Sequence, residues 1–112
     1  MEQDEIQIEE STEDGKEVYK IKGRIDNQTA PELQAKLDES FKLGENNLIL
    51  DFDEVDYLSS AGLRTILYTQ KRIKSIAGAS MTIVNVTPSV MEIFEMTGFT
   101  DFLTITPQIT KS

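Results

Sequence analysis

With 112 residues, the chain is long enough for one compact domain and too short for two of ordinary size. It has no cysteine and no histidine, which excludes disulfides, thiolate metal sites, cysteine nucleophiles and the proton acceptor of classical serine hydrolases. The net charge of -9, from 20 acidic and 11 basic residues, excludes the basic footprint of nucleic-acid binding and favours basic protein partners, unless the acidic residues simply form a solvated face.

Targeting and membrane signals are also missing from the sequence. No apolar run approaches the roughly 20 residues that cross a bilayer, and the acidic stretch Met1–Glu5 is the opposite of a secretory signal. We therefore expect a soluble, intracellular protein without a membrane partner.

The first predicted elements form a β-hairpin. Ile6 and Ile8 alternate with polar residues near positions 5–10, and Asp14-Gly15 is a strong turn signal. Between residues 18 and 25, apolar and basic residues alternate with period two, which predicts a strand with one buried and one wet face.

Helices and strands then alternate along the chain. A capping box at Thr29 and Glu32 opens a helix that ends before Gly44, and the apolar run 48–52 predicts a buried strand. A helix from the serines at 59–60 to about residue 76, a strand at 81–86, a helix over 87–97 that Thr87 caps, and a strand at 102–105 complete the chain.

The order ββαβαβαβ predicts a single α/β domain over residues 1–112. Its sheet should be mixed and mostly parallel, with right-handed crossovers, an antiparallel N-terminal hairpin, and helices after strands 2, 3 and 4.

Two serines at the entrance of the central helix stand out. A serine there caps the helix, worth about 1 kcal/mol, but one serine suffices and the second is unexplained. Ala61 and Gly62 follow, and glycine costs roughly 1 kcal/mol of helix propensity, so we expect a partner or an anion close to this backbone. On residue chemistry alone, a purely structural cap and a functional turn both stay open.

The acidic segment Asp51–Val55 offers a second candidate site. It resembles the DxDx(T/V) signature of haloacid-dehalogenase-type phosphatases, in which the first aspartate attacks phosphorus beside a metal ion. Against this, the segment does not follow the first strand, no acidic pair lies downstream, and the chain is short for such an enzyme. We favour solvated carboxylates in a loop, and expect no metal, cofactor or catalytic residue.

Four segments in order resemble STAS domains of the anti-sigma-factor-antagonist type. Residues 57–64 are similar to that family's signature turn, and residues 23–30 to its G-x-(L/I)-D-x-x-(T/N)-(A/S) segment. Residues 88–90 and 96–99 resemble its last strand–helix passage. The resemblance covers about residues 5–106.

The resemblance implies a cytoplasmic bacterial partner switch. In that family, the unphosphorylated antagonist binds an anti-sigma factor, which is usually a serine kinase of the GHKL ATPase type. The kinase phosphorylates the antagonist and so ends the binding, and a PP2C-type phosphatase removes the phosphate and restores the binding. The acceptor lies two residues before the glycine, at Ser60, with Ser59 as the alternative because it replaces the family's common aspartate. The implied partner-binding residues are Asp26, Asn27, Ser59, Ser60, Ala61, Gly62, Leu63 and Arg64.

Two other functions stay in view. A STAS domain also serves as a scaffold or accessory subunit in a stressosome-like or lipid-transport assembly, and the acidic segment leaves a small aspartate-dependent Mg²⁺ phosphatase as a third hypothesis. The antagonist, which is not an enzyme, is the function that we expect.

Overall fold

The computed structural model describes residues 6–107, so the acidic start at 1–5 and the tail after Pro107 lie outside the described residues. The predicted order ββαβαβαβ is confirmed, with one additional short 3-10 turn, η1. The elements are β1 (Gln7–Glu13), β2 (Lys16–Ile25), α1 (Ala30–Lys42), β3 (Asn47–Leu58), α2 (Ser60–Lys74), β4 (Ser80–Val86), α3 (Pro88–Thr97), η1 (Phe99–Asp101) and β5 (Thr104–Pro107).

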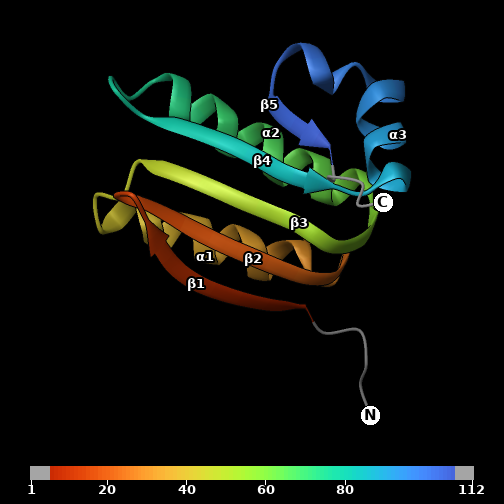
Figure 1. Ribbon diagram of the computed structural model, residues 1–112, viewed down its shortest axis with the longest axis horizontal. Coiled ribbons are helices and arrows are strands. Elements are labelled where there is room, and N and C mark those ends of the chain that lie inside the picture. The colour runs from red at the N-terminus through yellow and green to blue at the C-terminus, as the bar shows by residue number, and fades with distance from the viewer. Residues whose placement is uncertain (1–5, 108–112) are drawn as a thin grey trace.

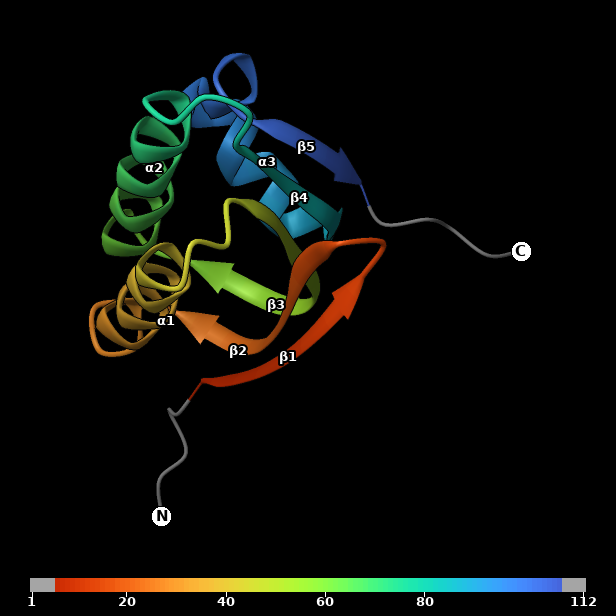
Figure 2. The same cartoon turned by 90° about the vertical axis from the view of Figure 1, so that its left-hand side faces the viewer.

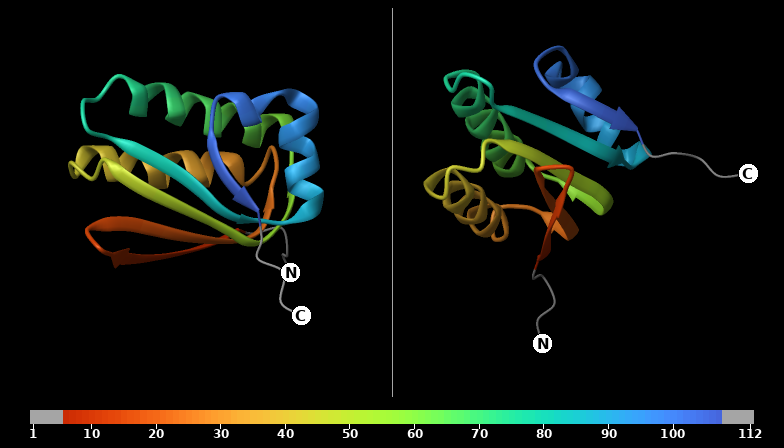
Figure 3. Two further views of the ribbon diagram at one scale, coloured as in Figure 1. Left: turned by 45° about the horizontal axis from the view of Figure 1, so that its top comes forward. Right: turned by 60° about the vertical axis from the view of Figure 1, so that its left-hand side comes forward.

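One five-stranded sheet forms the centre of the fold, with the strands in the order β1-β2-β3-β4-β5 (Figure 1). The hairpin β1–β2 is antiparallel and the other pairs are parallel, as the sequence predicts. Helices α1 and α2 cover one face of the sheet side by side (Figure 2). Helix α3 lies apart from them, beside β5 (Figure 3), and packs on the sheet through Phe94, whose ring stacks on Phe52 with centroids 6.4 Å apart.

The period-two pattern of β2 explains which face is buried. Tyr19, Ile21 and Ile25 are buried beneath the helices, while Lys20 and Lys22 are only half-buried on the other face. Leucine and phenylalanine side chains of β3 and isoleucine and methionine side chains of β4 fill the same core. Within residues 6–107, no helix is long and apolar enough to cross a lipid bilayer.

Strand β3 is longer than its apolar run predicts, since it continues from residue 52 to Leu58. The expectation that Asp51 and Asp53 lie in a loop is therefore wrong. They stand on the sheet face opposite α1 and α2, where charge is tolerated, and Lys20 of β2 places its Nζ 3.5 Å from Glu54 Oε2. The apolar run marked only the first part of the strand, in which Leu48, Leu50 and Phe52 are buried beneath the helices.

The two threonines predicted to cap helices do not do so. Thr29 precedes α1, but its hydroxyl donates to the carbonyl oxygen of Arg24 at 2.6 Å and accepts from the N–H of Asp26 at 2.8 Å. Thr87 precedes α3, and its hydroxyl donates to the carbonyl oxygen of Val55 at 2.9 Å. Both hydroxyls join the helix entrance to a neighbouring strand end, so the capping predictions were wrong although the helices begin where expected.

Candidate functional site

The connection between β3 and α2 is a single residue, Ser59. We call residues 58–64, which span this connection, the serine turn. The N–H of Ser59 donates to the carbonyl oxygen of Ile25 at 2.8 Å, and its own carbonyl oxygen accepts the N–H of Leu63 at 2.9 Å. The turn is thus tied to the end of β2 on one side and to the first turn of α2 on the other.

The two serines have different environments. Ser59 has extended backbone angles, and its hydroxyl accepts the N–H of Gly62 at 3.2 Å, so it is the helix cap. Ser60 is the first residue of α2, is exposed, and forms no side-chain hydrogen bond with any residue from 6 to 107. The Ser59 hydroxyl therefore stabilises the helix, and the Ser60 hydroxyl has no such role among residues 6–107.

Gly62 has an internal reason to be glycine. It is buried, and a Cβ atom there would lie 2.6 Å from Leu58 Cδ1, 2.7 Å from Ile25 Cγ2 and 3.1 Å from the Ile25 carbonyl oxygen. The first turn of α2 packs directly on the end of β2. This internal packing explains the glycine without a partner or an anion, and the expectation that either approaches this backbone stays a prediction.

Beside the serine turn, the loop between β2 and α1 is organised by Asp26. Its Oδ1 accepts the N–H groups of Thr29 at 3.1 Å and Gln28 at 2.9 Å, and the hydroxyl of Thr29 at 3.2 Å. These bonds, Thr29 first, and the nearby Arg24 guanidinium lower the pKa of the Asp26 carboxyl below its ordinary value. The carboxylate is thus occupied in shaping its own loop.

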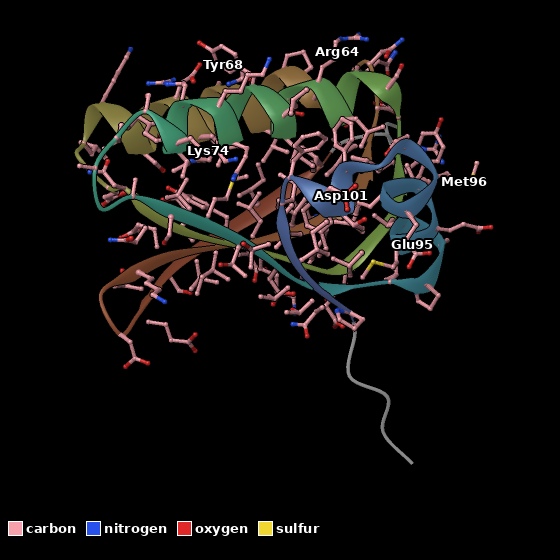
Figure 4. All side chains as sticks on the ribbon, turned by 90° about the horizontal axis from the view of Figure 1, so that it is seen from above. Arg64, Tyr68, Lys74, Glu95, Met96 and Asp101 are labelled. Carbon is pink, nitrogen blue, oxygen red and sulfur yellow. The ribbon has the colours of Figure 1, made fainter. Side chains whose placement is uncertain are left out.

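Two surface hollows flank the serine turn, and Asn27 lines both. The smaller, of about 260 Å³, lies between the β2–α1 loop and the end of β3 and is lined by Arg24, Asp26, Asn27, Gln28, Tyr57 and Ser59. The larger, of about 440 Å³, lies between α1 and α2 and is lined by Asn27, Ala30, Pro31, Gln34, Ala61, Arg64, Thr65 and Tyr68. Arg64 and Tyr68 project from α2 away from the sheet (Figure 4).

Comparison with known families accounts for this arrangement. The sequence profile of the STAS domain matches residues 5–111. The chain belongs to the STAS domain family. BtrV of Bordetella bronchiseptica, whose name classes it provisionally as an anti-sigma factor antagonist, is 34% identical over 86 residues, which are 77% of this chain and 73% of BtrV.

Solved STAS structures share the fold. An anti-sigma factor antagonist from Mycobacterium paratuberculosis superposes with a TM-score of 0.85 at 24% identity, over 95% of this chain and 89% of that one. SpoIIAA, a Bacillus cell fate determinant solved in its phosphorylated form, superposes with a TM-score of 0.67 at 18% identity, over 89% of each chain. At these identities the likeness establishes the STAS architecture.

In this STAS domain, the residues expected at the partner surface lie around the entrance of α2, the helix start formed by the serine turn and the β2–α1 loop. They differ in exposure. Asn27, Ser60 and Arg64 are exposed, whereas Asp26, Ser59 and Ala61 are half-buried. Gly62 and Leu63 are buried, so they position the serine turn and offer no side-chain surface. Sequence reasoning missed the guanidinium of Arg24, which lies over the Tyr57 ring at 4.3 Å, because the period-two pattern marked Arg24 only as a residue on a wet face.

The second candidate site of this STAS domain, the acidic segment of β3, is built differently. Oδ1 of Asp51 accepts the N–H of Asp53 at 3.0 Å and the side-chain amide of Asn85 at 3.1 Å. Residues 6–107 contain no group of three or more histidine, cysteine, aspartate or glutamate side chains arranged to hold a metal ion. The contacts of Asp51 thus organise the strands β3 and β4.

Proposed function

We propose that this protein is an anti-sigma factor antagonist, a non-enzymatic partner switch that acts in the cytoplasm. In its unmodified form it binds an anti-sigma factor that is a GHKL-type serine kinase, through a surface centred on the serine turn. The names of BtrV and of the Mycobacterium paratuberculosis protein support the antagonist function.

The observation that carries the proposal is the division of labour between the two serines. The hydroxyl of Ser59 accepts the N–H of Gly62 and caps the helix, while the hydroxyl of Ser60 is exposed and forms no hydrogen bond with any residue from 6 to 107. A kinase can therefore reach Ser60 without disturbing the helix entrance. Phosphorylation of Ser59 would instead modify the oxygen that accepts the N–H of Gly62, in a cap worth about 1 kcal/mol.

The modification is an ordinary phosphoryl transfer. The Ser60 oxygen forms a bond to the γ-phosphorus of ATP, the bond to ADP breaks, and the hydroxyl proton passes to a base of the kinase. A PP2C-type phosphatase restores Ser60 by hydrolysis, in which water attacks the phosphorus, the bond to the Ser60 oxygen breaks, and inorganic phosphate is released. The transfer places about -1.5 to -2 charges at the first residue of α2, where the helix dipole favours negative charge.

The domain should therefore keep its fold while the partner leaves. A neutral partner surface that fits against Asn27, Ser60 and Ala61 has no room for a phosphate, and burying that dianion unpaired costs several kcal/mol. The structure of phosphorylated SpoIIAA, which retains the same architecture, supports this local kind of switch.

The test uses the full chain as bait in three forms: wild type, Ser60→Ala and Ser60→Asp. We expect the wild type and the alanine variant to retain a GHKL-type ATPase, identified by mass spectrometry, and the aspartate variant to lose it. Ser11→Asp is the matched control, because it adds the same charge at an exposed position of β1, close to the β1–β2 hairpin turn and outside the serine turn, and should keep the partner. Equal retention by all baits would refute the switch, and phosphosite mapping that finds Ser60 unmodified would refute its control by phosphorylation.

A further inference from the structure

Arg64 stands one helical turn after Ser60 on the same face of α2. Residues four apart on a helix have Cβ atoms about 5–6 Å from each other, and an acidic group N-terminal to a basic one is the favourable orientation. Cα–Cβ bonds in a helix tilt toward its N-terminus, so the long side chain of Arg64 leans over the first turn. It lines the larger hollow together with Asn27 and with Ala61, the residue that follows Ser60.

The guanidinium of Arg64 is available to a new anion. It is exposed, points away from the sheet (Figure 4), and forms no ion pair or aromatic contact with any residue from 6 to 107. The other arginine at this entrance, Arg24, is already occupied, since its Nε lies 3.7 Å from Asp26 Oδ2 and its guanidinium covers Tyr57. Of these two arginines, Arg64 is therefore the one without a charged or aromatic partner among the described residues.

We propose that Arg64 holds the phosphate of phosphorylated Ser60 in a charge-assisted pair along α2. This inference rests on the proposed function, since it concerns the modified form of Ser60. The fork of N–H donors on arginine matches phosphate oxygens, and the partners are already at the correct spacing, so little ordering is required.

The pair makes the switch act on two charges at once. Before modification, the partner surface presents a neutral hydroxyl and a free cation; after it, a dianion is present and the cation is occupied by that dianion. A partner that uses a carboxylate to contact Arg64 would lose this contact in addition to meeting the phosphate. Asp26 and Asp56 carry the same sign as the phosphate. Asp26 Oδ2 already lies 3.7 Å from Arg24 Nε, and Asp56 is exposed, so salt screens its charge.

The test measures the second pKa of the phosphate in the full chain, with phosphoserine installed at position 60 by genetic encoding and followed by ³¹P NMR. An adjacent cation favours the dianion and lowers this pKa, which is about 6 for free phosphoserine. We expect Arg64→Gln to raise it by about 0.3 to 0.7, the equivalent of one exposed charge pair at contact, and Arg64→Lys to restore most of the difference.

Lys71→Gln is the matched control, because it removes one positive charge from the same exposed helix about 16 Å from Ser60, beyond the screening length in 0.15 M salt. It should leave the phosphate pKa unchanged. An unchanged pKa in Arg64→Gln, an equal rise in Lys71→Gln, or a larger rise in Arg24→Gln would overturn the proposal. Because phosphoserine is encoded, this result does not depend on whether a kinase modifies Ser60 in the cell, which the phosphosite mapping decides separately.

Discussion

Replacing Gly62 with alanine should destabilise this domain, although the same change stabilises most helices. Alanine has about 1 kcal/mol more helix propensity than glycine. In the first turn of α2, however, its Cβ would lie 2.6 Å from Leu58 Cδ1, 2.7 Å from Ile25 Cγ2 and 3.1 Å from the Ile25 carbonyl oxygen. That carbonyl oxygen accepts the N–H of Ser59, so it moves only at the expense of the bond that ties the serine turn to β2.

Overpacking of this kind costs about 1–3 kcal/mol, and two contacts under 3.0 Å place Gly62→Ala in the upper part of that range, at about 2–3 kcal/mol. After the gain of about 1 kcal/mol in helix propensity, the net loss in the free energy of unfolding should be about 1–2 kcal/mol. With the urea dependence usual for small domains, the unfolding midpoint of Gly62→Ala should fall by roughly 0.5–1 M, measured by circular dichroism. Ser60→Ala changes an exposed residue two positions earlier and is the control, and its urea midpoint should not fall. A Gly62→Ala variant as stable as the wild type would show that the first turn of α2 has more room than the structure gives it, and would refute the packing explanation of this glycine.

Three further outcomes follow from the same structure. Ser59→Ala should lose about 1 kcal/mol of stability, because the amide of the third helical residue loses its cap, whereas Ser60→Ala should change little in urea unfolding. Burial, aided by neighbouring glutamates, raises the pKa of Tyr19, so the folded state resists ionisation of this phenol. The contribution of Tyr19 to stability is therefore complete below the unfolded pKa of about 10 and falls as pH rises above it. Tyr19→Phe should flatten this alkaline fall in the free energy of unfolding, measured by urea titrations. The pKa of Asp26 is lowered, so its effect on stability has the opposite pH dependence. Its contribution is present above the ordinary carboxyl pKa of about 4 and is lost as pH falls through the folded pKa. ¹³C NMR of the carboxyl carbon measures that folded pKa, and Asp26→Asn identifies the signal.

Much of the fold could be predicted from the sequence because local pattern and tertiary packing agree. The alternation in β2 and the apolar stripes of the helices each serve one buried face, so element order and strand direction follow. The end of β3 did not follow, because three of its last six residues are acidic, so residues 53–58 form neither an apolar run nor a period-two pattern. The hydroxyls of Thr29 and Thr87 were predicted to cap helices. In the fold they donate to carbonyl oxygens of Arg24 in β2 and Val55 in β3, and a single sequence does not show that these carbonyl oxygens lie close.

At the candidate site, the sequence located the serine turn but not the roles of its residues. Capping chemistry predicts that one of two adjacent serines binds the helix amide, and only backbone angles decide that Ser59 is the one. The reason for Gly62 depends on Ile25, which is 37 positions away in sequence and was not linked to the turn by any local pattern. Because such contacts join residues far apart in the sequence, the position of the turn could be predicted while the roles of its individual residues could not.

The absence of slack between β3 and α2 has a consequence for association. Because a single residue joins a core strand to a core helix, the Ser60 side chain can change its rotamer but its backbone cannot wander independently of the domain. At the proposed binding surface, the backbone therefore lost its conformational entropy when the chain folded. A protein that docks there would need little further ordering of this backbone, so the entropy cost of binding would be small. Affinity at such a rigid entrance should respond steeply to the chemistry of one oxygen atom.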